Sequence, residues 1–118
     1  MTLAQVPSSI AALAVLALGL IVTFKPDALE KVGVTAVSAI GRTELRAVFG
    51  GMFLAMAGVC LVTRHPYAFL TAGSMWLGDV AVRAFAVFAD RPKPAEGLTV
   101  LAIGSVVGGM LLTGFWAW

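Results

Sequence analysis

The sequence predicts an all-α protein, a four-helix transmembrane bundle. Three observations predict it: the composition, the mean hydropathy and the grouping of the apolar residues along the chain. Of its 118 residues, 60% are hydrophobic and only 12% are charged, and the mean hydropathy is +0.99. Soluble domains have about 45–50% apolar and about 25% charged residues, and a small soluble core could not bury so much apolar surface. The apolar residues also gather in four long stretches, separated by polar segments that contain proline.

Each of the four stretches has the length of about 17–25 residues that a membrane-crossing helix needs. The expected spans are residues 8–24, 44–63, 67–89 and 97–115, within one integral membrane domain of residues 1–118. The proline-containing segments 25–27, 64–66 and 90–94 separate them. Proline lacks a backbone donor and restricts the residue before it, so these segments predict turns. Hydrocarbon satisfies no free backbone groups, so the spans are expected to be helical.

The first span is expected to be a retained helix, because no basic residue precedes it and no cleavage pattern follows. The segment after it contains Pro26, Asp27 and Glu30, which suit the first turn of a helix. Apolar residues recur there near helical spacing, at positions 29, 32, 36, 37 and 40. This pattern predicts a short helix lying in the membrane interface, or alternatively a buried loop that closes one end of the bundle.

The distribution of basic residues predicts the orientation of the chain. The two longer connections contain Lys25, Lys31, Arg42, Arg91 and Lys93, whereas the turn between the second and third spans contains Arg64. Basic loops stay in the cytoplasm, so both termini are expected outside it, in what we expect to be a bacterial inner membrane. Trp116 and Trp118 would then lie at the outer interface, in contact with membrane lipid.

Several function classes are disfavoured by composition and motif. A formal net charge of +2 does not form the basic surface of a nucleic-acid-binding protein. Cys60 is the single cysteine, so no internal disulfide or cysteine-based metal cluster is possible. We found no nucleophile motif, phosphate loop or zinc motif, and we expect a non-enzymatic protein with no metal and no cofactor.

Asp79 and Arg83 stand out because both lie inside the third span, one helical turn apart. A charged residue at the centre of a span costs about 2.5–3.5 kcal/mol on insertion scales, so both are expected to face the bundle interior. Two interpretations remain open. The pair could be a structural ion pair that fixes helix register, or it could be a site for a proton, an ion or a small polar ligand.

The second span supplies a candidate partner face, on which Glu44, Ala47, Gly51, Ala55 and Gly58 recur at helical spacing. Its small residues would allow close helix packing. Glu44 is expected to contact Arg83 between helices, or alternatively to stabilise the helix dipole in the first turn.

Three further sets of residues are candidates for a role, and two of them have two interpretations each. Trp76 shares the face of Asp79 and could stack over a cation or ligand, or could simply pack. Arg42 and Arg46 are expected to extend toward lipid head groups. Gly104 and Gly108 form a G-x-x-x-G motif, which could bind a second copy or a partner, or could pack within the bundle.

The segment Gly41-Arg42-Thr43-Glu44-Leu45-Arg46-Ala47, followed by Gly50-Gly51 and later by Gly78-Asp79 with Arg83, resembles a family of small bacterial four-helix inner-membrane proteins, loosely similar to DoxX-type proteins. The resemblance covers the second and third spans. It implies that Glu44, Arg46, Asp79 and Arg83 are the family's polar residues, and it implies no reaction. Small multidrug transporters have a similar length, but their key carboxylate lies in the first span, which has no ionisable residue here.

Two functions are consistent with these features. The first is an accessory or assembly subunit that packs against membrane partners, as a homo-oligomer or in a larger complex. The second is a small-molecule or proton-coupled binding or transport protein that uses Glu44, Asp79 and Arg83. The sequence favours the first slightly, because its ionisable residues can pair with one another and leave no open site.

Overall fold

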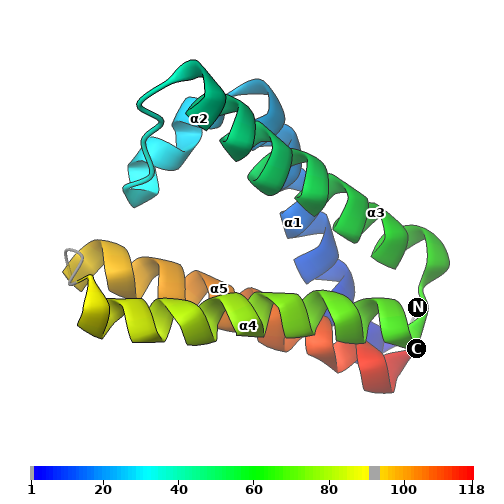
Figure 1. The fold of residues 1–118 in the computed structure, drawn as a ribbon. Coiled ribbons are helices and arrows are strands. Elements are labelled where there is room, and N and C mark those ends of the chain that lie inside the picture. Colours follow the sequence, from blue (N-terminus) through cyan, green and yellow to red (C-terminus); the bar gives the residue numbers. More distant parts are fainter. Residues whose placement is uncertain (1, 91–93) are drawn as a thin grey trace.

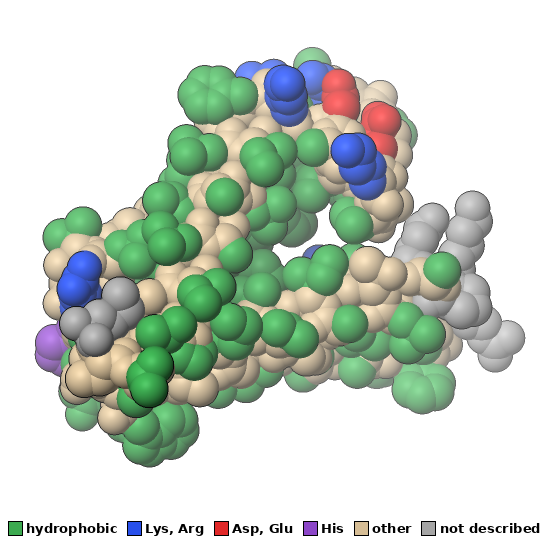
Figure 2. Space-filling view, turned by 180° about the vertical axis from the view of Figure 1, so that it is seen from behind, with side chains coloured by type: hydrophobic (Ala, Val, Ile, Leu, Met, Phe, Trp, Pro, Cys, Tyr) green, Lys and Arg blue, Asp and Glu red, His purple; other side chains and the backbone are tan. Residues whose placement is uncertain are grey.

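The computed structural model describes residues 2–90 and 94–118. Every regular element in these two ranges is a helix, so the predicted all-α fold is confirmed. Four helical stretches are long and apolar enough to cross a membrane: Leu3–Phe24, Ala39–Thr63, Pro66–Ala89 and Gly97–Ala117. Figure 2 shows hydrophobic side chains over most of the visible surface, with basic and acidic side chains gathered mainly at one end.

The elements in chain order are η1 (Leu3–Gln5), α1 (Val6–Phe24), η2 (Pro26–Val32), α2 (Ala39–Leu45), η3 (Arg46–Met52), α3 (Phe53–Thr63), α4 (Pro66–Ala89) and α5 (Pro94–Ala117). The second span therefore begins at Ala39, earlier than the expected start at Glu44. Ser38 explains the earlier start, because its Oγ accepts a hydrogen bond from Gly41 N at 3.2 Å and caps α2. The η3 segment is a π-helical stretch that joins α2 to α3.

The connection after α1 combines features of both expected alternatives. It forms a short 3₁₀ helix, η2, whose Pro26 and Leu29 are buried, and Gly33 ends it in the left-handed region at φ 88°. Val37 and Ile40 belonged to the same expected apolar face, but both are exposed. Helical spacing alone was misleading here, because the chain leaves the helix at Gly33 and changes direction before α2.

The helices form two arms (Figure 1). In one arm, α1 packs against η3 and α3, and in the other arm α4 packs along α5. The arms meet near the two chain termini, where α1 also contacts α5. They diverge toward the end that carries η2 and α2, so that α3 and α4 contact each other far less than α4 and α5 do.

The main core cluster draws buried side chains from both arms. It contains Ala11, Ala12, Val15, Ala57, Cys60, Phe69, Ala72, Trp76 and Leu111. At the nearby chain ends, the Trp118 indole Nε1–H donates to Ser8 Oγ at 3.1 Å, and the ring stacks on Phe69 with centroids 5.8 Å apart. Trp118 is therefore a packing residue, whereas Trp116 is 76% exposed, as an interfacial tryptophan would be.

The G-x-x-x-G motif of α5 packs within the chain. A Cβ on Gly104 would lie 2.7 Å from Val80 Cγ2, and a Cβ on Gly108 would lie 3.0 Å from Leu77 Cδ2. Both glycines thus allow α5 to lie close to α4. Of the two alternatives for this motif, packing inside the bundle is the one that these contacts support.

The expected small-residue face of the second span does not pack against α4. Gly51 is exposed, and a Cβ added there would meet nothing within 4 Å. Its neighbour Gly50 is buried instead, where a Cβ would collide with Thr23 of α1. The sequence therefore identified a glycine-dependent helix contact one residue away from its actual position, and with a different partner helix.

Candidate functional site

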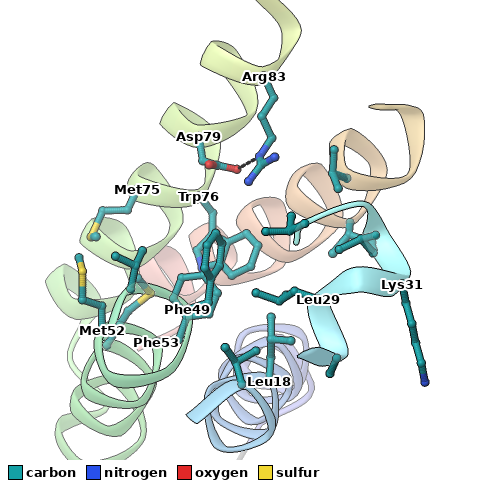
Figure 3. Close-up of a pocket in the computed structure, with 18 residues that line it drawn as sticks. Leu18, Leu29, Lys31, Phe49, Met52, Phe53, Met75, Trp76, Asp79 and Arg83 are labelled. Atoms are coloured by element: carbon teal, nitrogen blue, oxygen red, sulfur yellow. Dashed lines mark hydrogen bonds and ion pairs between the residues drawn. The ribbon is translucent and has the colours of Figure 1, made fainter. Parts of the chain in front are cut away.

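A cavity of about 510 Å³ lies between the two arms and reaches Asp79 and Arg83. It has the size of a small-molecule site, for which volumes of about 300–1,000 Å³ are typical. Most of its lining is apolar (Figure 3): Leu18 and Val22 from α1, Ala28, Leu29, Val32 and Val34 from η2 and the residues after it, Val48, Phe49, Met52, Phe53 and Met56 from η3 and α3, Met75 and Trp76 from α4, and Val100 and Ile103 from α5.

Aromatic side chains form one wall of this cavity. Phe49 and Phe53 meet edge to face with ring centroids 5.6 Å apart, and Phe53 lies 5.1 Å from the Trp76 ring. Phe49 belongs to the π-helical segment, and such segments frequently occur at functional sites. The wall therefore joins η3 and α3 to α4 across the space between the arms.

An ion pair forms the polar side of the cavity. Arg83 Nε donates to Asp79 Oδ2 at 2.7 Å, across one turn of α4. The side chains are 34% and 47% exposed, respectively, so the cavity leaves both partly open. Figure 3 shows the Arg83 side chain extending from α4 toward the space between Trp76 and Leu29. The pair was expected to face the bundle interior; it lies on the cavity between the two arms, where Asp79 is exposed.

The guanidinium group of Arg83 retains hydrogen-bonding capacity. Within the described part of the chain, its Nε–H bonds Asp79, and the terminal nitrogens make no hydrogen bond. An arginine has five N–H donors in a planar fork, so four donors remain. Lys31 is the other cationic residue in the described lining, and Figure 3 shows its side chain extending away from Arg83 and Trp76.

Glu44 does not contact Arg83, so that prediction is wrong. The Glu44 side chain is exposed at the far end of the other arm and makes no ion pair with a described residue. Asp79, one turn away on α4, is the partner of Arg83. The two arms diverge at this end of the molecule, which separates Glu44 from α4 (Figure 1).

The two arginines expected at the lipid head groups differ. Arg42 forms an ion pair with Asp27, which ties α2 to η2. Arg46 is exposed, as an arginine at the interface would be. The contact of Arg42 was not predicted, because Asp27 lies on a separate segment whose path back to α2 was unknown.

Trp76 packs rather than stacking on a cation. Its side chain is 8% exposed and contacts Phe53, and its Nε1–H is buried with no acceptor among the described residues. The cation over an aromatic ring in the described structure is Arg64, which lies 5.5 Å from the Trp118 ring.

The sequence analysis missed the aromatic and η2 sides of the cavity. Phe49 and Phe53 are four residues apart, a spacing that places side chains on one helix face. That spacing could have marked them as a pair, but apolar residues are common in every span, so nothing set them apart.

Comparisons of the chain with protein-family models, with curated proteins and with solved structures found no match. The resemblance to DoxX-type membrane proteins therefore stays a prediction. The described residues include no group of three or more histidine, cysteine, aspartate or glutamate side chains that could hold a metal ion.

Proposed function

We propose that this protein binds a small, mainly apolar molecule that enters from the membrane into the cavity between the two arms. The observation that carries the proposal is that Asp79 and Arg83 lie on a cavity of about 510 Å³ whose other described lining residues, apart from Lys31, have apolar side chains or the ring of Trp76. Apolar pockets with a few convergent polar groups are the usual form of small-molecule sites. This function corresponds to the binding or transport protein that the sequence also allowed. The binding site is now one cavity, and Glu44 has no part in it.

The alternative of a purely structural ion pair fits the packing less well. A pair that only fixes helix register would be expected between closely packed helices, with its remaining donors satisfied by protein groups. Here both members lie on α4, and the terminal nitrogens of Arg83, at the edge of the cavity, bond no described residue. The pair therefore does not join the two arms, and its polar groups are left available for a ligand.

The test is to purify the protein in native lipid discs and to identify bound small molecules by mass spectrometry. We expect one apolar compound to be enriched at near-stoichiometric amounts over the surrounding lipid. Ile103→Trp places a large side chain on the cavity wall and is expected to abolish the enrichment. Val106→Trp, on the same helix but outside the lining, is the matched control and should retain it.

Two results would contradict the proposal. The first is the absence of any enriched compound in the wild-type protein. The second is equal enrichment in the wild type and in Ile103→Trp, because the compound would then lie outside the cavity.

An accessory or assembly subunit remains a second candidate, and the exposed face of η3 and α3 favours it. Ala47, Gly51 and Ala55 are exposed, and a Cβ on Gly51 or Gly58 would meet nothing within 4 Å. Small residues with this spacing allow close packing of another transmembrane helix. Gly51→Leu should then abolish co-purification of a membrane partner while the cavity still binds its ligand. If the Gly51→Leu variant still co-purifies a membrane partner and still binds the ligand, this candidate function is wrong.

A further inference from the structure

We infer that the ligand of this cavity is a neutral amphiphile, with a single apolar chain and an uncharged head group whose oxygen accepts hydrogen bonds from Arg83. This inference rests on the proposed function, because it assumes that the cavity binds a molecule. It adds the chemistry of the head group, which the donors and the charge balance of the site specify.

The free donors of Arg83 specify an acceptor. Its Nε–H is used by Asp79, and the terminal nitrogens have no partner in the described structure. The remainder of the described lining is apolar except for Asp79, for Lys31, which extends away, and for the Trp76 Nε1–H, which is buried without an acceptor among the described residues. A donor that faces an apolar cavity gains from an acceptor, so a ligand that supplies one is favoured there. A carbonyl oxygen of an amide, ester or ketone meets this requirement.

The charge balance next to Arg83 specifies a neutral head group, because Lys31, the other cation of the described lining, extends away from it. Arg83 and Asp79 carry opposite charges in direct contact, so the pair has no net charge. An anionic ligand on Arg83 would lie close to the Asp79 carboxylate, and a cationic ligand on Asp79 would lie close to the guanidinium. Either arrangement adds an uncompensated charge to an apolar cavity, where charge is poorly solvated. A neutral acceptor uses the free donors and leaves the pair balanced.

The shape of the site specifies where the apolar chain lies. The aromatic wall is formed by Phe49, Phe53 and Trp76. On α4, Trp76 lies one turn from Asp79 in the direction of the end where the two arms meet. A cavity of about 510 Å³ accommodates one drug-sized molecule rather than a larger assembly. With its oxygen on Arg83, a single-chain amphiphile would place its chain against this wall.

The test uses four probes that share a dodecyl chain and differ in the head group. They are N-methyldodecanamide as the neutral acceptor, laurate as the anion, dodecyltrimethylammonium as the cation, and dodecane without a polar group. Binding is measured by titration calorimetry in phosphatidylcholine nanodiscs, with the heat of empty nanodiscs subtracted. We expect the amide to bind most tightly.

Two variants connect the preference to Arg83. Arg83→Met should weaken amide binding by about ten-fold or more, because a hydrogen bond to a charged donor is lost. The Arg83→Met variant leaves Asp79 without its partner and could misfold. The second variant is therefore the double variant Asp79→Leu with Arg83→Met, in which both charges are removed. The double variant should bind the amide and dodecane equally. Arg46→Met, an exposed arginine on the other arm, is the control and should bind as the wild type does.

The outcomes separate the inference from the proposed function. If no probe binds above empty nanodiscs, the cavity is not a binding site and both are overturned. If dodecane binds as well as the amide, or if laurate or the ammonium binds more tightly, the cavity binds ligands but the inference is wrong. If the double variant still binds the amide more tightly than dodecane, the inference is also wrong, because Arg83 is then not the donor.

Discussion

Asp79 and Arg83 show how a helix that is long and apolar enough to cross a membrane can carry two charged residues. Their spacing of one turn allows the guanidinium to bond the carboxylate directly, at 2.7 Å, without a contribution from the described residues of another helix. An ion pair within one helix has no net charge and can enter the membrane as a unit, at a lower cost than two separate charges. The second arm is then free to diverge from α4, which leaves the space for the cavity.

The first prediction concerns the coupling of these two residues. Arg83→Met should destabilise the protein more than the double variant Asp79→Leu with Arg83→Met, because the single change leaves a carboxylate without its cation in an apolar cavity. We expect a coupling free energy of about 0.5–3 kcal/mol, the range for residues in direct contact. The measurement is a double-mutant cycle of unfolding free energies in mixed micelles. Strictly additive changes would mean that the ion pair does not contribute to folding.

Helix α4 packs against α5 through glycines on both helices. Gly73 of α4 lies against Leu112, where an added Cβ would come within 2.9 Å of the backbone nitrogen. A side-chain contact could relax by a rotamer change, but a backbone atom can move only if the helix shifts. Gly78 lies on the same helix with nothing within 4 Å of its Cβ position. The two glycines therefore have different roles, although they lie five residues apart on the same helix.

The second prediction uses this matched pair. Gly73→Ala should destabilise the protein by about 1–3 kcal/mol, because the added methyl overpacks the contact between α4 and α5. Gly78→Ala should be neutral or slightly stabilising, since alanine favours helix and its methyl group meets no neighbour. Thermal unfolding in a neutral detergent checks both variants. Equal effects of the two substitutions would be inconsistent with the described packing.

Helix packing was predicted from glycine patterns with mixed success. Gly104 and Gly108 correctly marked a close approach of two helices, but their spacing did not show whether the partner was α4 or another chain. For η3 the pattern pointed to Gly51, whereas Gly50 makes the contact. A glycine pair indicates that a backbone approaches closely, but the rotation of the helix decides which of the two glycines it meets.

At the scale of the whole molecule, the chain ends hold the two arms together. Ser8 of α1 is buried and accepts a hydrogen bond from Trp118, which also stacks on Phe69 of α4. Gln5 adds a second link, because its Nε2 donates to Ala117 O at 3.0 Å. These contacts close one end of the molecule, so the cavity lies between a joined end and a divergent one.

The third prediction tests this closure. Trp118→Phe keeps an aromatic ring on Phe69 but removes the hydrogen bond to Ser8, which should cost about 0.5–1.5 kcal/mol. Ser8→Ala should cost less in the Trp118→Phe background than in the wild type, because the bond from Trp118 is already lost there and only the bond that Ser8 Oγ donates to Gln5 O at 3.2 Å remains to be removed. Trp116→Phe is the control at an exposed position and should leave the unfolding free energy unchanged. A full effect of Ser8→Ala in the Trp118→Phe background would refute the shared bond.

The fourth prediction tests the orientation expected from the basic residues. In a Cys60→Ala background, Ser38→Cys near the start of α2 should react with a membrane-impermeant thiol reagent only after the cells are opened. His65→Cys, in the turn between α3 and α4, should react in intact cells. Both positions are exposed, so burial does not explain a difference in labelling. The reverse pattern would place both termini in the cytoplasm.

The four helical spans and the unusual nature of Asp79 and Arg83 follow from the sequence alone. Span length and apolar composition depend on local sequence, and a charge pair one turn apart is recognisable without any knowledge of neighbouring helices. The arrangement of the arms was decided only by packing, because apolar helices offer each other many similar faces. For this reason Glu44 was paired wrongly, and the aromatic wall of the cavity became evident only when η3 and α3 were placed opposite α4.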